Sequence, residues 1–275
     1  MSVFAGLLDD AAVFPPGLKP LPEAVPAHAR HRRSRYAELV GPLILAAPAL
    51  DGLGALLAGP LELAVTAPGG PAQLPGVMTT AAELPVRLQG LEIAAPEGMS
   101  AAEFFGALAP AGEVPVFVEI PRDERRAEFI AACAETGRQA KFRTGGVRAD
   151  LYPDEAELAA AIRAVVDAGV PFKATAGLHH AIRNTDPETG FEQHGFLNLL
   201  LATAAAMSGA GDAELVAVLA ERDSEKVAAG VSTVDGSVRE RFRSFGTCSV
   251  IEPVTELAAL GLVPAELAEE EGETA

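Results

Sequence analysis

The chain has 275 residues, of which 49% are hydrophobic and 21% are charged, so one large domain with a sizeable buried core is expected. A formal net charge of −17 at pH 7 argues against nucleic acid as a partner, because no basic stripe is present to neutralise phosphates. Two cysteines far apart in the sequence argue against a disulfide framework, and without a long apolar run or a secretory signal we expect a cytoplasmic protein with no membrane span.

Short apolar runs alternate with alanine-rich stretches of helical period along the chain. Strands are predicted at Val3–Leu8, Leu39–Ala46, Leu61–Thr66, Leu88–Ala94, Val114–Ile120, Ala140–Thr144, Pro171–Thr175 and Ser244–Cys248. Helices are predicted at Leu21–Tyr36, Ala49–Ala58, Ala72–Leu84, Ala101–Leu108, Arg122–Thr136, Glu155–Ala168, Phe196–Met207, Ala213–Arg222 and Glu252–Leu260.

The repeated order of strand and helix indicates an α/β fold, although the stretch Lys226–Glu240 has no clear pattern. The strand–helix order predicts a single (β/α)8 TIM barrel over residues 1–265, followed by an acidic flexible tail at 266–275. An open doubly wound sheet is the alternative, but the glycine fingerprint that usually follows the first strand of such a sheet is absent. The barrel is therefore the predicted fold.

Two lysines fall on neighbouring predicted strands, Lys141 on the sixth and Lys173 on the seventh. Because strand side chains alternate between faces, Arg143 shares a face with Lys141 and Thr175 shares one with Lys173. Three cations that point into one interior would lower one another's pKa, and a lysine of lowered pKa is a nucleophile suited to Schiff-base chemistry. The alternative is a structural role, in which each lysine pairs with a carboxylate.

Other polar residues fall at the carboxyl ends of predicted strands, where a barrel builds its active site. They are Asp9 and Asp10 on the first strand, Glu92 on the fourth, Glu119 on the fifth and Ser249 just after the eighth. Barrel interiors are usually apolar, so these residues indicate a site. Alternatively, the glutamates only neutralise a lysine or arginine, and the aspartates cap a turn.

The longest irregular stretch, His179–Gly195, follows the seventh strand and is a candidate lid or substrate-binding loop. His179 or His180 could carry out acid–base work, because an imidazole titrates near neutral pH. Adjacent histidines do not easily converge on one ion, so no metal is expected.

In chain order, these motifs resemble the deoxyribose-phosphate aldolase family of class I aldolase barrels. The resemblance covers most of the chain and lies in short motifs: Leu8-Asp9-Asp10, Val116-Phe117-Val118-Glu119, Lys141-Phe142-Arg143-Thr144-Gly145, Phe172-Lys173-Ala174-Thr175-Ala176-Gly177 and Phe245-Gly246-Thr247-Cys248-Ser249. It implies an aldolase-like lyase with a Schiff base on Lys141, while Lys173 lowers the pKa of that amine. Protons would move through Glu119 or His179.

The resemblance also implies a small-molecule carbonyl substrate and no cofactor. Substrate contacts are expected from Asp9, Asp10, Glu92, Arg143, Thr144, Gly145, Thr175, Gly177, His180, Gly246 and Ser249. Three departures from the family pattern weigh against deoxyribose 5-phosphate itself: Ala94 replaces an aspartate, Arg143 replaces a serine, and Leu178-His179-His180 replaces most of a phosphate loop.

Three interpretations stay open at this point. The first is the imine-forming lyase. The second is a barrel enzyme that uses the lysine pair to stabilise an enolate or carboxylate without an imine. The third is a barrel that only binds a metabolite or a partner. The chain could also form a homo-oligomer, and the backbone at Gly246–Ser249 is predicted to bind an anion at the start of the last helix.

Overall fold

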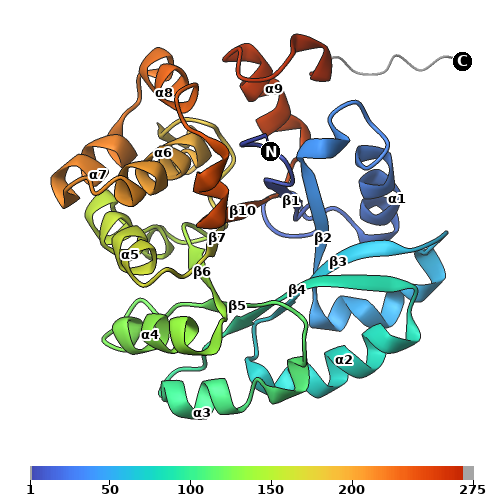
Figure 1. The fold of residues 1–275 in the computed structure, drawn as a ribbon. Coiled ribbons are helices and arrows are strands. Elements are labelled where there is room, and N and C mark those ends of the chain that lie inside the picture. The colour runs from blue at the N-terminus through green and yellow to red at the C-terminus, as the bar shows by residue number, and fades with distance from the viewer. Residues whose placement is uncertain (1, 269–275) are drawn as a thin grey trace, which may run out of the picture.

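The computed structural model describes residues 2–268 and contains a closed barrel of eight parallel strands (Figure 1). The barrel strands are β1 (Leu8–Asp10), β2 (Val40–Ala46), β3 (Leu61–Ala67), β4 (Val86–Ala94), β5 (Val116–Glu119), β6 (Gln139–Arg143), β7 (Phe172–Thr175) and β10 (Phe242–Thr247). They follow one another around the barrel in chain order, and β10 closes it by pairing with both β7 and β1. The predicted (β/α)8 barrel is confirmed.

The helices lie outside the ring of strands (Figure 1). They are α1 (Leu21–His31), α2 (Leu74–Glu83), α3 (Ala101–Gly106), α4 (Arg126–Thr136), α5 (Glu155–Asp167), α6 (Phe196–Met207), α7 (Asp212–Ala220), α8 (Ser224–Val231) and α9 (Ile251–Ala259). Within residues 2–268, no helix combines the length and the apolar character that a membrane crossing needs.

The α5 helix illustrates how the sequence builds this outer layer. It starts after Asp154, whose carboxylate accepts the backbone N–H of Glu157 and so caps the first turn. One face of the helix, formed by Leu158, Ile162 and Val165, is buried in the main apolar core. Each such side chain contributes about 1.5–3 kcal/mol through its burial. This helix therefore holds the segment between β6 and β7 firmly against the barrel.

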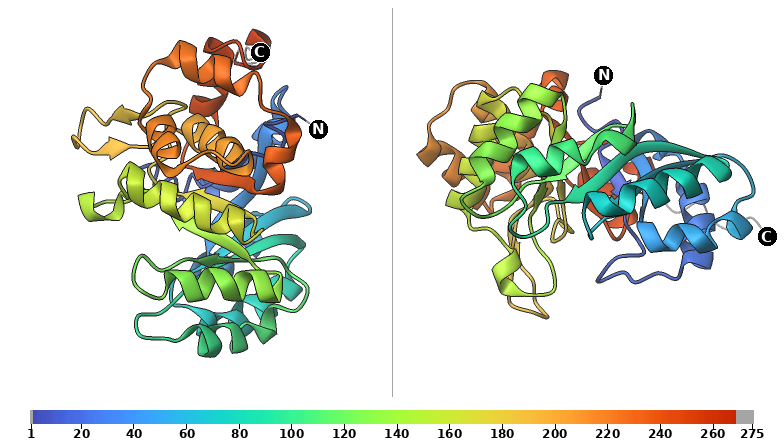
Figure 2. Two further views of the ribbon diagram at one scale, coloured as in Figure 1. Left: turned by 60° about the vertical axis from the view of Figure 1, so that its left-hand side comes forward. Right: turned by 90° about the horizontal axis from the view of Figure 1, so that it is seen from below.

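A short hairpin extends from the barrel after β7, formed by β8 (Asn184–Thr185) and β9 (Glu192–Gln193). It lies beside the segment that follows β6, and the two project together from the rest of the molecule (Figure 2). The ring of Phe191 packs on the ring of Tyr152 with 5.4 Å between centroids. These two loops form one wall above the carboxyl ends of the strands.

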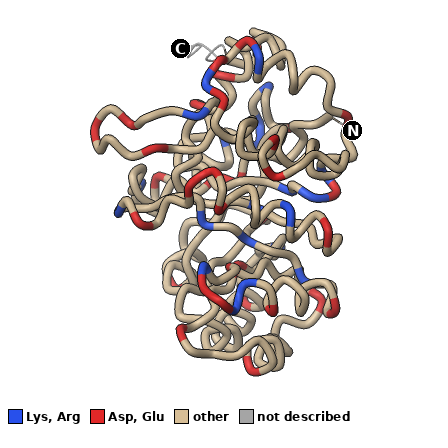
Figure 3. The backbone as a smooth tube through the Cα atoms, turned by 90° about the vertical axis from the view of Figure 1, so that its left-hand side faces the viewer, with Lys and Arg blue, Asp and Glu red and all other residues tan. Residues whose placement is uncertain are grey.

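Lysines and arginines are scattered among acidic residues along the backbone and do not gather in one stripe (Figure 3). Many of the exposed ones pair with a neighbour, such as Arg148 with Asp150 and Arg32 with Glu62. Exposed pairs of this kind contribute little to stability, because water screens them. The fold therefore depends mainly on its apolar core.

Several predicted boundaries are wrong. The first strand is Leu8–Asp10 and not Val3–Leu8, because the residues before it form a turn in which Gly6 has a φ of +57°. The predicted helix at Ala49–Ala58 is a pair of 3-10 segments, consistent with two glycines that disfavour a helix.

The remaining corrections concern helix ends and the tail. The first helix ends at His31 and not at Tyr36. The stretch without a clear pattern contains α8 and a 3-10 segment at Gly236–Glu240. Of the predicted tail at 266–275, residues 269–275 lie outside the described residues, and Ala265–Leu267 forms a 3-10 turn.

Candidate active site

Lys141 and Lys173 lie on the adjacent strands β6 and β7, as the sequence predicts, and the structure pairs them in register. Both side chains point into the barrel, and the residues are 4% and 2% exposed. A buried ammonium group must be paired or lose its proton. The surroundings of each amine therefore decide what it can do.

Carboxylates from three other strands surround the two amines. Lys173 Nζ donates to Asp9 Oδ2 at 2.5 Å and to Glu92 Oε1 at 2.6 Å. Lys141 Nζ lies 2.9 Å from Glu92 Oε2 and 3.1 Å from Glu119 Oε2. Glu92 thus bridges the two lysines. Its Oε2 atom faces Lys141, and its Oε1 atom faces Lys173.

Two further polar groups complete this network. The hydroxyl of Ser244 donates to Asp9 Oδ2 at 2.6 Å, and Arg143 Nε donates to Glu119 Oε1 at 3.0 Å. The cluster therefore contains three cations and three carboxylates, arranged alternately. This balance lets the charges of Lys141, Lys173, Glu92 and Asp9 remain buried, because each has an opposite charge within hydrogen-bond distance.

The carboxylates reverse the pKa shift that the sequence predicted for the lysines. Burial alone would lower the pKa of Lys141, but Glu92 and Glu119 outweigh it and the pKa is raised. Burial likewise would lower the pKa of Lys173, but Asp9 and Glu92 raise it. The prediction that these two lysines have lowered pKa values is wrong, because alternation reveals which side chains share a face but not which carboxylates reach them.

The three carboxylates differ in the direction of their pKa shifts and in their exposure. Burial opposes ionisation of Glu92, but both lysines outweigh it and lower the pKa to about 2. For Glu119, burial is again outweighed, here by Lys141 and Arg143, and the pKa is lowered. Burial raises the pKa of Asp9 despite Lys173. The Glu119 side chain is 19% exposed and that of Glu92 only 1%, so Glu119 is the carboxylate better able to exchange protons with a ligand.

A cavity of about 480 Å³ opens above this network at the carboxyl ends of the strands. Lys141, Glu92, Glu119 and Arg143 line it, whereas Lys173 does not. Lys173 is fully enclosed, with its ammonium 5.3 Å from the centroid of a neighbouring phenylalanine ring, that of Phe117. Lys141 is therefore the lysine that can meet a ligand.

The upper walls of the cavity are largely apolar. They include Phe14, Ile44, Leu151, Tyr152 and Phe191. The last three come from the two loops that project after β6 and β7. The predicted ligand-binding loop at His179–Gly195 thus contributes to the cavity, and the β6–β7 loop joins it there.

Four more of the predicted site residues line the cavity, namely Thr175, Gly177, His179 and Gly246. Two others hold the loops in place. Thr144 Oγ1 donates to the backbone oxygen of Ala176 at 2.7 Å, and Gly145 packs so closely on Gly177 that a Cβ atom would lie 2.8 Å from its Cα. These contacts join the ends of β6 and β7.

Three predicted residues have partners away from the cavity lining. Asp10 pairs with buried His28 of α1 at 3.0 Å, and His180 pairs with Glu256 of α9 at 2.6 Å. The hydroxyl of Ser249 accepts the N–H of Glu252 at 3.4 Å at the start of α9. Binding of an anion there stays a prediction.

Sequence reasoning did not identify Cys248 as a cavity residue. Its Sγ atom lies 3.3 Å from His179 Nδ1, and both residues line the cavity. The signal was its place in the motif that ends the last strand, one residue beyond β10. Within residues 2–268, no group of three or more His, Cys, Asp or Glu residues is arranged to hold a metal ion.

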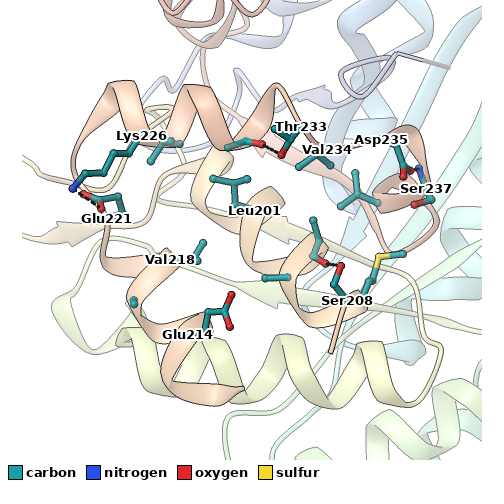
Figure 4. Close-up of a pocket in the computed structure, with 17 residues that line it drawn as sticks. Leu201, Ser208, Glu214, Val218, Glu221, Lys226, Thr233, Val234, Asp235 and Ser237 are labelled. Atoms are coloured by element: carbon teal, nitrogen blue, oxygen red, sulfur yellow. Dashed lines mark hydrogen bonds and ion pairs between the residues drawn. The ribbon is translucent and has the colours of Figure 1, made fainter. Parts of the chain in front are cut away.

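A larger cavity, of about 770 Å³, lies outside the barrel between α6, α7 and α8 (Figure 4). Its walls are mostly small and apolar side chains, and an ion pair of 3.5 Å joins Lys226 to Glu221 there. Buried, mutually paired ionisable groups lie instead in the barrel. We therefore place the candidate active site at the smaller cavity.

No family model and no curated protein matches the chain. Among solved structures, the chain is similar to nitroalkane oxidase from Streptomyces ansochromogenes, with 17% sequence identity, 93% of this chain and 67% of that chain covered, and a TM-score of 0.31. A likeness this weak supports no inference about activity. The fold and site define a (β/α)8 barrel with a lysine–carboxylate network beneath a partly apolar cavity, and the function must be argued from that site.

Proposed function

We propose that this barrel is a carbon–carbon lyase that forms a Schiff base between Lys141 and a small carbonyl substrate. The observation that carries the proposal is that Lys141 lines the cavity while Lys173 is tied beneath it to two carboxylates. The ordered resemblance of the strand motifs to the deoxyribose-phosphate aldolase family supports the same lysine. Access to the cavity and the sequence motif thus both favour Lys141 over Lys173 as the nucleophile.

Imine formation first requires a neutral amine, because an ammonium group has no lone pair to attack a carbonyl. Glu119 is ionised in the resting site and lies 3.1 Å from Lys141 Nζ, so it is placed to take the proton. The amine then adds to the carbonyl carbon, and a proton passes from the nitrogen to the new alkoxide oxygen to give the carbinolamine. Glu119 returns the proton to the hydroxyl of the carbinolamine, which leaves as water and yields the iminium ion.

The iminium ion then draws electrons from the adjacent carbon–carbon bond. A hydroxyl on the β-carbon loses its proton to Glu119 or His179, the bond cleaves, and the electron pair is held as an enamine. Arg143 has a side chain that is 38% exposed and lines the cavity, so it can hold an anionic group of the substrate. Ala94, which replaces the family aspartate, supplies no proton carrier.

Lys173 acts in this scheme through Glu92. It competes with Lys141 for the same carboxylate, which reduces the electrostatic stabilisation that Glu92 gives the Lys141 ammonium. Lys173 also keeps Glu92 ionised after Lys141 has become neutral. We therefore assign Lys173 the role of an electrostatic modifier.

The raised pKa of Lys141 favours a second candidate function. In this alternative, Lys141 keeps its proton, and the ammonium group stabilises an enolate or carboxylate without forming an imine. Both candidates use the same cavity. They differ in whether a covalent bond forms.

Reduction with borohydride in the presence of a panel of small carbonyl compounds separates the candidates. The lysines of the chain are Lys19, Lys141, Lys173 and Lys226, so peptide mapping by mass spectrometry identifies the modified residue directly. We expect a reduced adduct on Lys141 and its loss in Lys141→Ala. Lys226→Ala is the matched control, because that side chain is 68% exposed outside the barrel.

An adduct on Lys173 would overturn the assignment of Lys141 as the nucleophile, and an adduct on no lysine would overturn the Schiff-base proposal itself. Exchange of a substrate α-proton with solvent, without any trapped adduct, would support the second candidate instead. Binding of a carbonyl compound with neither exchange nor trapping would support a barrel that only binds its ligand.

A further inference from the structure

The thiol of Cys248, which the proposed chemistry does not use, forms a pair with the imidazole of His179 at the cavity. Cys248 follows β10, and His179 lies in the loop after β7, the neighbouring strand. Sγ lies 3.3 Å from Nδ1, within hydrogen-bond distance for sulfur. The strand order therefore brings together two residues that are 69 positions apart in sequence.

Close packing holds the cysteine in this position. A Cβ atom on Gly17 would lie 3.1 Å from the Cβ of Cys248, so the segment before α1 presses against it. The described contacts of His179 Nε2 include no hydrogen-bond partner in residues 2–268. Nδ1 is thus the ring nitrogen committed to the protein, and Nε2 is left for a ligand.

Both groups are uncharged near neutral pH. Burial raises the pKa of the Cys248 thiol, and nearby Glu252 and Asp10 act in the same direction. Burial lowers the pKa of His179, and His180 adds to this effect while Asp186 opposes it. Between a neutral thiol and a neutral imidazole, either the S–H group donates to an unprotonated Nδ1, or an Nδ1–H group donates to the sulfur.

We propose that Cys248 is a positioning residue whose S–H donates to His179 Nδ1 and thereby fixes the ring as the tautomer protonated at Nε2. A ring held in this way presents an N–H donor to the cavity. It suits a carbonyl, hydroxyl or carboxylate oxygen of the ligand and cannot accept a proton at Nε2. This part of the proposal rests on the proposed lyase function: in that reaction, His179 orients the substrate and Glu119 is the proton acceptor.

The tautomer can be measured on the ligand-free protein, so the test does not depend on the proposed reaction. Long-range 1H–15N correlation spectra of the full chain with 15N-labelled histidine distinguish the two ring nitrogens, and His179→Gln assigns the signal. We expect the wild-type signal of a ring protonated at Nε2. Cys248→Ser should keep it, because a hydroxyl can also donate.

Cys248→Ala should instead give a mixture of tautomers and move the titration midpoint of His179 to higher pH, since the S–H bond stabilises the neutral ring. Cys133→Ala removes the other thiol, which lies in α4, and should change neither property. A wild-type ring protonated at Nδ1 would overturn the proposal. So would a His179 tautomer and titration midpoint that are the same in Cys248→Ala and wild type. Failure of borohydride trapping would leave this result intact and would count only against the lyase.

Discussion

Lys141 and Lys173 stand in register on adjacent strands, yet they share one carboxylate and only Lys141 faces the cavity. The shared carboxylate, Glu92, couples their protonation, so neither lysine titrates as an isolated group. A proton removed from Lys141 changes how strongly Glu92 binds Lys173. This coupling is the property that the first three predictions test.

Replacing Glu92 with glutamine should strongly destabilise the fold. The substitution keeps the size of the side chain but leaves two buried ammonium groups with less compensating charge. Breaking a buried ion pair in this way costs about 3–5 kcal/mol. Urea unfolding followed by circular dichroism measures the change. Glu62→Gln is the matched control, because the side chain is 36% exposed, and it should change the free energy of unfolding by less than about 0.5 kcal/mol. Equal unfolding of Glu92→Gln and wild type would contradict the prediction.

The free energy of unfolding should fall as the pH is lowered through the acid range. The pKa of Glu92 is about 2 in the folded protein against an ordinary 4.5, so its contribution is fully present above about pH 4.5 and is lost as the pH falls toward 2. Asp9 acts in the opposite sense, because its pKa is raised. The difference between wild type and Glu92→Gln, measured by denaturant unfolding at a series of pH values, isolates Glu92. That difference should shrink on acidification, and a constant difference would refute this assignment.

Trapping of a carbonyl compound on Lys141 should become more efficient as the pH rises from neutral to alkaline, because the raised pKa keeps the resting amine protonated. Lys173→Ala should move this pH dependence to still higher pH. Without Lys173, the whole charge of Glu92 acts on Lys141 and holds its proton more tightly. The trapped fraction, measured by mass spectrometry across a pH series, gives the midpoint. A midpoint that moves to lower pH in Lys173→Ala would show that Lys173 acts in the opposite sense.

The sequence was sufficient to predict the barrel and the adjacent strands on which its two lysines lie. Alternation along β6 and β7 is a local property, and β-strand side chains obey it almost without exception. The pairing of Glu92 with both lysines could not be predicted from alternation, because β4, β6 and β7 come together only when the barrel closes. For that reason, the direction predicted from the sequence for the lysine pKa shifts was wrong.

Contacts that form only on folding also explain why some predicted site residues do not line the cavity. Asp10 and Asp9 are neighbours in sequence and alternate in direction, so Asp9 meets Lys173 while Asp10 meets His28 of α1. His179 and His180 likewise separate, one toward Cys248 and the other toward Glu256. In each pair, the sequence indicated the segment, but the packing of a helix or a strand end determines which partner each residue contacts.

The last prediction concerns the loop after β7, which carries His179 and one wall of the cavity. Gly177 has a φ of +69°, and a Cβ atom there would lie 2.8 Å from the Tyr152 ring and 3.0 Å from the Cα of Gly145. Gly177→Ala should therefore suffer both the left-handed backbone strain, about 1–2 kcal/mol, and the cost of overpacking, about 1–3 kcal/mol. Thermal and urea unfolding measure the sum.

Gly190→Ala is the matched control within the same loop. Gly190 has a similar φ of +72°, but a Cβ atom there would have no other atom within 4 Å, so only the backbone strain of about 1–2 kcal/mol applies. The difference between the two variants isolates the contact of Gly177 with Gly145 and Tyr152, which joins the two loops over the cavity. If Gly177→Ala were no more destabilising than Gly190→Ala, the two loops would not be packed against each other as closely as these distances require.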